Sequence, residues 1–507
     1  MINRLGYSKQ HIQMLKHIIY IILIKGYKMG NRKMQRANMR SAEKMQRCID
    51  AKMHRCAFCF LLFTFYFLLS VSPSYALPWN NKRLPAINSQ QKIGYVNINW
   101  WDNFSDSCLK YYVALAIENN HDAREASWKV EEYKQFVKLQ FSQELPSLSV
   151  GGAYLLGHYP DTIKGIKSNI FAVPFIAGYE ADIFLKNHDK TKSSKKAYCA
   201  SKFQEQSIYI SLASDVATTY INILKFDKQI QLQQKLIKVK CEELLREQAK
   251  YNRGVISIPN LNKAKQDYIS AKSNLDELIK SRDKSLNELA VLTGDSPANI
   301  CALKRGRLDN LEYKTQIPSE ISSDVVFSRP DILAAEANLE KAKIDVRVAR
   351  KEFLPTISLN GIYSLDNIGP DGFGTWGSTI AAALARASLD LFKGGYKVAN
   401  LKINKSRYEQ MFEAYQQTDL NALKEVQNSL LLIREDSKID QNTSKNLRTQ
   451  KDNYQRAIMS YKNGVISCPN LLSESEKFIA MEQNQVNTKS ARLVDYITLY
   501  KSVGGKL

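Results

Sequence analysis

Two hydrophobic periodicities alternate along this chain. Residues 185–258 contain no proline, and apolar side chains such as Leu212 and Val216 recur at helical spacing among lysine, glutamate and glutamine. The pattern predicts one continuous helix, of which residues 198–251 alone would span about 80 Å. A second helix of this kind is predicted over about residues 399–461. Such helices need equally long helices beside them, because they extend far beyond a globular core.

Between the helical stretches lie four runs in which apolar side chains alternate with small or polar ones, the period of two that is typical of β-strands. They cover residues 146–157, 171–184, 355–365 and, with a weaker pattern, 375–392. Opposite the apolar face, the first run presents Ser147 and Ser149, and the third presents Thr356, Ser358 and Asn360. Length and alternation are typical of transmembrane barrel strands, which meet lipid on one face and water on the other. Edge strands of a soluble sandwich are the alternative.

Four strands are too few to close a membrane barrel, because the smallest such barrels have about eight. An open sheet edge is not tolerated in hydrocarbon, so several chains would have to share one barrel. A ring of copies would also bundle the long helices into a coaxial tube. In such a pore, the five polar strand residues named above face the lumen.

The chain contains this plan twice. Residues 251–261 recur at residues 461–471 with eight identities in eleven positions, and residues 145–149 match residues 354–358. Such self-similarity indicates a tandem duplication. The predicted organisation is a leader (1–76), an N-terminal segment (77–103), a first repeat (104–300), an equatorial linker (301–312) and a second repeat (313–507).

In both copies the repeated motif predicts a tight helix–turn–helix tip. Gly254 and Gly464 are placed at the left-handed position that commonly ends a helix. Ser257 and Ser467, each followed two residues later by proline, are placed to open the next helix.

The longest apolar run, residues 57–72, follows a basic stretch and precedes a small-x-small sequence that ends at Ala76. This order is typical of a secretory signal peptide, so we expect cleavage after Ala76. An uncleaved membrane anchor is the alternative, although sixteen residues are fewer than the ~20 of a spanning helix. Met39, Met45 and Met53 are further possible starts. No cysteine lies just after the leader, so no lipid attachment is expected there.

The net charge of +22 would favour nucleic acid or an anionic membrane as a partner, but half of it, +11, comes from residues 1–76. A secreted chain does not meet nucleic acid, so we expect no such partner. The basic cluster at residues 186–196 follows the second strand run directly. We interpret it as a solvated collar at the membrane base of the barrel.

No catalytic or metal-binding constellation is expected. The five cysteines beyond the leader include no C-x-x-C pair, and the histidines there are widely separated. Residues 372–377 satisfy G-x-G-x-x-G, but they lie outside any βαβ unit and are interpreted as the loop between the third and fourth strands. We therefore expect neither enzymatic activity nor a cofactor.

Several extended motifs occur along the chain: NINWWDNFSDSCLKYYVALAIENNHDAREASWKVEEY at 97–133, LTGDSP at 292–297, RPDILAAEANLEKAKIDVRVARKEFLPTISL at 329–359 and LDLFKGG at 389–395. On these residues, nearly all of 98–505 resembles the TolC-type outer-membrane efflux proteins, and the first motif resembles the NodT-type branch of RND efflux outer-membrane factors. The resemblance implies a mixed α/β membrane protein, a homotrimer with a 12-stranded barrel in outer-membrane lipid and a periplasmic α-helical tunnel. It also implies a tripartite pump, in which a periplasmic adaptor (a membrane fusion protein) joins the channel to an inner-membrane transporter, of the RND type in this branch.

The resemblance also implies roles for residues at the tips. Adaptor docking falls on the two tip loops, at Gly254, Val255, Ile256, Gly464, Val465 and Ile466. Where some members carry an aspartate ring at the periplasmic constriction, this chain has Asn470 and Ser473. This departure implies a neutral constriction, with Glu474 and Glu476 nearby.

The resulting hypothesis is a passive exit duct in the cell outer membrane, with its helical tunnel in the periplasm. It would carry small molecules or drugs that an inner-membrane transporter delivers through the adaptor. The alternative within the family is the channel of a type I protein secretion system. The alternative from another class is a coiled-coil structural or adhesin protein, held by an uncleaved anchor.

Overall fold

The structure is a computed structural model, and it describes residues 94–156, 169–297, 304–317, 321–366, 373 and 379–506. The chain divides into one unit of residues 1–86 and a second of residues 87–507. The predicted leader with its cleavage site after Ala76 lies outside the described residues, as does most of the G-x-G-x-x-G loop.

Two helices of 67 residues dominate the second unit, α6 (Lys186–Asn252) and α10 (Tyr396–Lys462). At 1.5 Å per residue, each is about 100 Å long, which confirms the predicted long helix in each copy. Each leads into a shorter helix, α7 (Ile258–Thr293) or α11 (Cys468–Ser502). The other described helices are α4 (Ser107–Asn119), α5 (His121–Ser142), α8 (Ser323–Phe327) and α9 (Pro330–Lys351), with 3₁₀ turns η2 (Ile98–Asn103) and η4 (Leu308–Asn310).

Each long helix ends two residues before the predicted glycine. Gly254 has φ 72° and Gly464 has φ 74°, a left-handed conformation that other residues adopt only at a cost. The Val255 amide then donates a 2.9 Å hydrogen bond back into the last turn of α6. Ser257 and Ser467 occupy the N-cap positions of the next helices, although neither side chain bonds the helix amides. The predicted helix–turn–helix tips are confirmed.

The strands form one antiparallel sheet in the order β1–β3–β4–β5, and β2 also pairs with β3. Their bounds are β1 (Ser147–Val150), β2 (Ala153–Leu156), β3 (Asn169–Ala181), β4 (Thr356–Asp366) and β5 (Thr379–Ser388). The prediction of one unbroken first strand is therefore wrong. The fourth predicted run extends too far at its end, because the strand stops at Ser388, and residues 375–378 lie outside the described residues.

Pro174 of β3 accounts for the break in the first predicted strand. β1 and β2 pair with β3 on either side of it. Proline has no amide hydrogen to give to a neighbouring strand, so regular pairing is interrupted at that point. The Gly151 amide still donates to the Pro174 carbonyl at 2.9 Å. β1 and β2 lie one after the other beside β3, so the five strands occupy four positions across the sheet.

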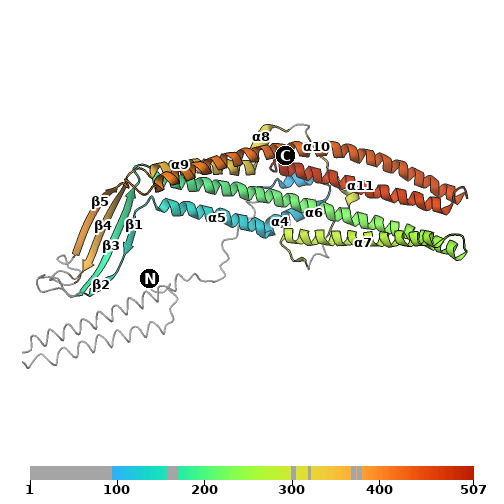
Figure 1. Cartoon of the computed structure of the whole chain (residues 1–507), viewed down its shortest axis with the longest axis horizontal. Coiled ribbons are helices and arrows are strands. Elements are labelled where there is room, and N and C mark those ends of the chain that lie inside the picture. The colour runs from blue at the N-terminus through green and yellow to red at the C-terminus, as the bar shows by residue number, and fades with distance from the viewer. Residues whose placement is uncertain are drawn as a thin grey trace, which may run out of the picture. The chain divides into compact units, whose positions relative to one another are not determined.

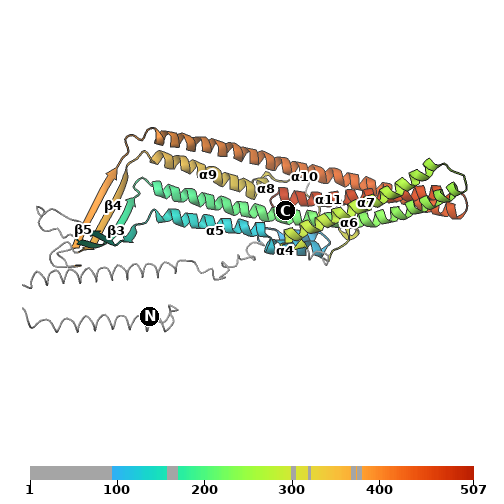
Figure 2. The same cartoon turned by 60° about the horizontal axis from the view of Figure 1, so that its bottom comes forward.

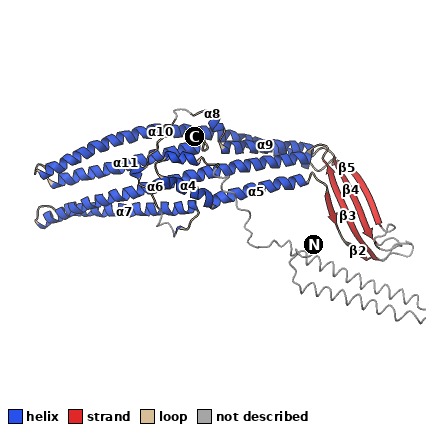
Figure 3. Ribbon diagram, turned by 180° about the vertical axis from the view of Figure 1, so that it is seen from behind, coloured by secondary structure: helices blue, strands red, loops and turns tan. Residues whose placement is uncertain are grey.

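The strands lie beyond one end of the helices, and both helix–turn–helix tips lie at the other (Figure 1). Near the strands, α5, α6, α9 and α10 lie side by side as one layer, with α5 and α10 at its edges (Figure 2). The view from behind shows the same separation of strands and helices (Figure 3). Among the residues that the structure describes, no helix combines the length and hydrophobicity needed to cross a bilayer.

The main hydrophobic core lies where the N-terminal strap, residues 94–106, meets α4, α6 and α11. Trp101 is fully buried, and its ring lies 5.2 Å from that of Tyr500, which is also fully buried. Trp100 stacks on the same Tyr500 at 4.4 Å. This aromatic cluster, residues 100, 101 and 500, fastens the strap to the last helix of the chain.

Residues at equivalent positions of the two copies either contact each other or make the same kind of contact within their own copy. Phe104 pairs with Tyr313 in an isolated β-bridge, and the two are 209 residues apart, the offset of the repeat. In the first copy, Asn120 donates to a carbonyl near the end of α7 at 3.0 Å. In the second, Arg329 donates to the Ser502 carbonyl at the end of α11 at 2.7 Å. The duplication is therefore visible in side-chain contacts.

Candidate functional site

The strand register places the five predicted lumen residues on one face of the sheet. Ser147 pairs with Gly178, which pairs in turn with Asn360. Ser358 pairs with Glu180 of β3. Directly paired residues project to the same face, and residues two apart on a strand share it. The polar face therefore carries Ser147, Ser149, Thr356, Ser358 and Asn360, together with Glu180, Arg386 and the aliphatic residues Ile176, Ile362 and Leu384.

The opposite face of the sheet is apolar. By the same register it carries Leu148, Val150, Phe171, Val173, Phe175, Tyr179, Leu359 and Tyr363. The sheet thus has one face suited to lipid and one suited to water, as a pore wall requires. The lumen assignment of the individual residues stays a prediction.

The two tips lie at the end away from the strands (Figure 1), and each exposes an apolar side chain. Val255 is 68% exposed and Val465 is 74% exposed, while Ile256 and Ile466 are half-buried. The valines are therefore the side chains that a partner can reach. Sequence reasoning missed Ile258, the first residue of α7, which is also exposed. The equivalent position in the second copy is Cys468, so the repeat gave no signal for it.

The two residues of the predicted constriction, Asn470 and Ser473, lie on the first turns of α11 and are exposed. They are three residues apart and so lie on one face of the helix. The nearby acids are engaged elsewhere within the chain. Glu474 accepts hydrogen bonds from Gln450 and Lys477, both at 2.9 Å.

A ladder of polar contacts joins α6 of the first copy to α11 of the second. Lys240 forms an ion pair with Glu476 at 2.6 Å. Gln483 donates to the Gln233 side chain at 3.0 Å, and Gln229 donates to the Gln483 carbonyl at 2.9 Å. The partners are about 250 residues apart, so the sequence gave no sign of these contacts.

The ladder contains a charged pair in partly buried surroundings. Burial acts to lower the pKa of Lys240, but its hydrogen bonds to Glu476 and Glu243 outweigh that effect and raise it. Burial raises the pKa of Glu476. This ion pair, together with the glutamine contacts, links the hairpin of α6 and α7 to the hairpin of α10 and α11.

Two carboxyl groups meet between α10 and α11. Asp495 is 7% exposed, and its carboxyl group lies close to that of Asp436. Burial, together with the charge and hydrogen bond of Asp436, raises the pKa of Asp495 from 3.8 to about 7. A carboxylate close to another one ionises less readily, because the two negative charges repel each other.

Asp495→Asn is expected to stabilise the protein at pH 8 by roughly 1–3 kcal/mol. The pKa of Asp495 is higher in the folded than in the unfolded chain, so the protonated carboxyl favours folding. This contribution to stability is fully present below pH 3.8 and is lost as the pH rises through about 7, where the buried group becomes charged. An asparagine stays neutral at pH 8 and avoids that loss. Thermal unfolding followed by circular dichroism at pH 5 and pH 8 measures the effect. Asp452→Asn, at an exposed position of α10, is the control. Destabilisation by Asp495→Asn at pH 8 would contradict the raised pKa of Asp495.

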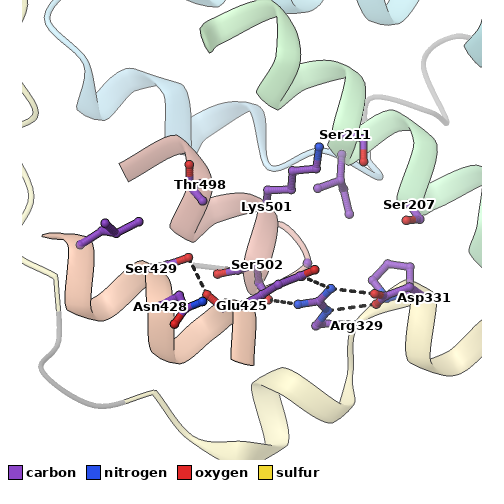
Figure 4. Close-up of a pocket in the computed structure, with 14 residues that line it drawn as sticks. Ser207, Ser211, Arg329, Asp331, Glu425, Asn428, Ser429, Thr498, Lys501 and Ser502 are labelled. Carbon is purple, nitrogen blue, oxygen red and sulfur yellow. Dashed lines mark hydrogen bonds and ion pairs between the residues drawn. The ribbon is translucent and has the colours of Figure 1, made fainter. Parts of the chain in front are cut away.

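A pocket of about 490 Å³ lies where the start of α9 meets α6, α10 and α11 (Figure 4). Its buried Arg329 donates to both carboxylate oxygens of Asp331, at 3.0 and 2.7 Å, and to Glu425 at 2.8 Å. The same guanidinium holds the Ser502 carbonyl. We interpret this cluster as a fastening between α9, α10 and α11, since its charges are used within the chain.

Within the described residues, no group of three or more histidine, cysteine, aspartate or glutamate side chains is placed to hold a metal ion. Cys108, Cys199, Cys241 and Cys468 are free thiols.

Long helices with paired tips and a sheet with one apolar face define an outer-membrane channel. The sequence profile of the outer membrane efflux protein family matches residues 112–295 and 322–505. The chain belongs to the outer membrane efflux protein family. The predicted family, fold class, outer-membrane location and role as an efflux channel are confirmed. The assignment to the NodT-type branch and the boundaries of the two repeats stay predictions.

Two relatives show how far the similarity extends. The cation efflux system protein CusC of Escherichia coli is 25% identical over 413 residues, which cover 81% of this chain and 89% of CusC. The toluene efflux pump outer membrane protein TtgC of Pseudomonas putida is 25% identical over 426 residues, 80% of this chain and 84% of TtgC.

Solved structures share the fold. The CmeC outer membrane channel of Campylobacter jejuni aligns with a TM-score of 0.72 and 23% identity, covering 81% of this chain and 88% of CmeC. The open state of the MtrE outer membrane channel of Neisseria gonorrhoeae aligns with a TM-score of 0.69 and 26% identity, covering 79% and 90%.

Proposed function

We propose that three copies of this chain close one 12-stranded barrel and form the passive exit duct of a tripartite efflux pump. The observation that carries the proposal is the sheet itself: four strand positions with an apolar face and open edges at β1 and β5. Unpaired edges are not tolerated in hydrocarbon, so each edge needs the opposite edge of a neighbouring copy.

The edge helices of the layer support the same closure. On the part of α10 that lies at the height of α5, Val398, Ile403 and Phe412 are exposed, and on α5, Phe136 and Leu139 are exposed. Apolar surface on both edges is suited to head-to-tail packing of α10 on the α5 side of the next copy, which closes a ring. Such a ring continues the barrel as a helical tunnel.

The tips would meet the rest of the pump. Val255 and Val465 form an exposed apolar rim at the end away from the barrel, which is suited to the helical hairpins of a periplasmic adaptor. The inner-membrane partner would be an RND-type transporter, and the cargo would be small molecules. Bond-making chemistry forms no part of this proposal, since energy would come from that transporter.

The periplasmic mouth would be closed by the first turns of α11. Asn470 and Ser473 would ring the constriction, and the ladder from Lys240 to Glu476 would hold the two hairpins together in the closed state. Opening would then require the adaptor to separate α11 from α6.

Asn470→Asp tests the gate. Three added carboxylates at the mouth should bind a multivalent cation about tenfold or more tightly than the neutral ring does. Single-channel conductance in planar bilayers, with hexamminecobalt(III) added on the periplasmic side, measures the block. Asn463→Asp adds the same charge on the tip loop and serves as the matched control. Equal block of the wild type and Asn470→Asp would contradict the assignment, and absence of channels would refute the duct.

Of the two alternatives to an efflux duct, one is not supported and the other stays open. An anchored coiled-coil protein is not supported, because the chain belongs to the outer membrane efflux protein family and its strands form one sheet. Type I secretion stays an alternative that the identity of the inner-membrane partner decides.

A further inference from the structure

One side of the helix layer is strongly basic where it approaches the sheet. Near the start of α6, Lys192, Lys195 and Lys202 are exposed. Near the end of α9, Lys343 and Arg350 are exposed. At 100° per residue, the three lysines of α6 lie within about 80° of one another, and the two cations of α9 lie within about 20°.

Ion pairs place these two groups on the same side of the layer. Lys196 of α6 pairs with Glu340 of α9, beside the exposed lysines. The buried Asp189 accepts from Arg347 at 2.7 and 2.8 Å and from Lys351 at 2.6 Å. The two cations share the single negative charge of Asp189, so this cluster carries a net positive charge.

We call this side the basic collar, and its acids do not balance its cations. The collar holds eight cations, Lys192, Lys195, Lys196, Lys202, Lys343, Arg347, Arg350 and Lys351, against four acids, Glu144, Asp189, Glu336 and Glu340. Within residues 186–196, Lys192 and Lys195 are exposed as predicted, whereas Asp189 and Ser193 are buried in helix contacts. The predicted place of this stretch at the membrane base stays a prediction.

The collar lies on the outside of the proposed duct, an assignment that rests on the proposed function. Lys186 forms an ion pair with Glu180 at 2.7 Å, and Glu180 pairs with Ser358 on the polar face of the sheet. At 100° per residue, Lys186 projects about 180° from Lys195 and about 160° from Lys202. If the polar face lines the lumen, these lysines point away from it.

The collar begins close to the membrane surface. Where β5 leads to α10, Leu391 is 91% exposed and Phe392 is 87% exposed, and Ile183 is exposed at the matching turn before α6. Exposed apolar side chains at the base of a barrel mark the lipid interface. Lys192 lies about 9 Å along α6, and Arg350 is one residue from the end of α9, so both side chains reach the headgroup layer.

We propose that the basic collar binds anionic phospholipid headgroups of the periplasmic leaflet of the outer membrane. Guanidinium and ammonium groups bind phosphate oxygens through charge-assisted hydrogen bonds, and each cation near an anionic surface strengthens binding about fivefold. The collar would fix the depth of the barrel and recruit anionic lipid around it.

Lipid enrichment around the purified full-length protein tests the proposal. The protein is reconstituted into phosphatidylcholine bilayers that contain phosphatidylglycerol as a minor component, and the lipids retained after mild extraction are quantified by mass spectrometry. The wild type should enrich phosphatidylglycerol about fivefold, and Lys192→Glu/Lys195→Glu should lose most of that enrichment. Added salt should weaken it as well.

Lys445→Glu/Arg448→Glu is the matched control, because both residues are exposed on α10 about 75 Å from its start. This variant should keep the wild-type enrichment. Equal enrichment in the Lys192→Glu/Lys195→Glu variant, or equal loss in the control, would overturn the proposal. Oligomeric mass and conductance are read on the same samples. Conducting trimers without enrichment refute the collar alone, whereas absence of trimers refutes the proposed duct.

Discussion

Val255→Asp combined with Val465→Asp is expected to abolish efflux while the channel still folds and assembles. Both side chains are exposed at the tips and make no part of the core, so the folded chain tolerates the change. In the docked pump, each aspartate would be buried against the adaptor without a partner, which costs several kcal/mol per site. Resistance of a host strain that lacks the wild-type gene should fall at least about tenfold, to the level of the deletion.

The matched control keeps the added charge but spares the apolar side chains. Asn252→Asp combined with Asn463→Asp changes exposed residues next to the same two turns. Asn252 accepts a hydrogen bond from Gln248 at 2.9 Å, which an aspartate can also accept. Wild-type resistance in this control, with loss in the valine variant, assigns docking to the apolar rim. Full resistance in the valine variant would contradict it.

Trp101→Ala is expected to lower the free energy of unfolding by about 3–5 kcal/mol. The ring is fully buried and packs against Trp100 at 4.9 Å and Tyr500 at 5.2 Å. Its removal leaves a cavity where the N-terminal strap meets α11, and the rigid helices around it cannot collapse to fill the space. Thermal unfolding monitored by circular dichroism at 222 nm measures the loss.

Tyr111→Ala separates this packing effect from the loss of any aromatic ring. Tyr111 lies on α4 and is exposed, so its replacement should cost less than about 0.5 kcal/mol. A similar small cost for Trp101→Ala would mean that the strap is not fastened through this residue.

Local pattern was enough to predict the long helices and the tips. α6 and α10 follow from uninterrupted helical spacing, and their ends follow from Gly254 and Gly464, each a residue that tolerates a left-handed backbone. The polar and apolar faces of the strands follow from alternation alone. The break of the first strand did not, because it depends on Pro174 in a partner strand rather than on residues 146–157 themselves.

Contacts between the two copies could not be read from the chain. The pair between Lys240 and Glu476 joins residues that are more than 200 positions apart, and so does the Phe104 bridge to Tyr313. The raised pKa of Asp495 likewise depends on how deeply α11 packs, which periodicity does not reveal. Such contacts are decided by tertiary packing.

The trimer is the central claim, and the mass of the complex tests it most directly. The full-length protein is expressed and extracted in mild detergent from separated outer membranes. The molar mass of the complex is then measured by light scattering, with correction for bound detergent. Its N-terminal residue is read from the same sample. The account predicts three copies per complex, each beginning at Leu77. A complex of one or two copies would leave sheet edges open in lipid and would contradict it.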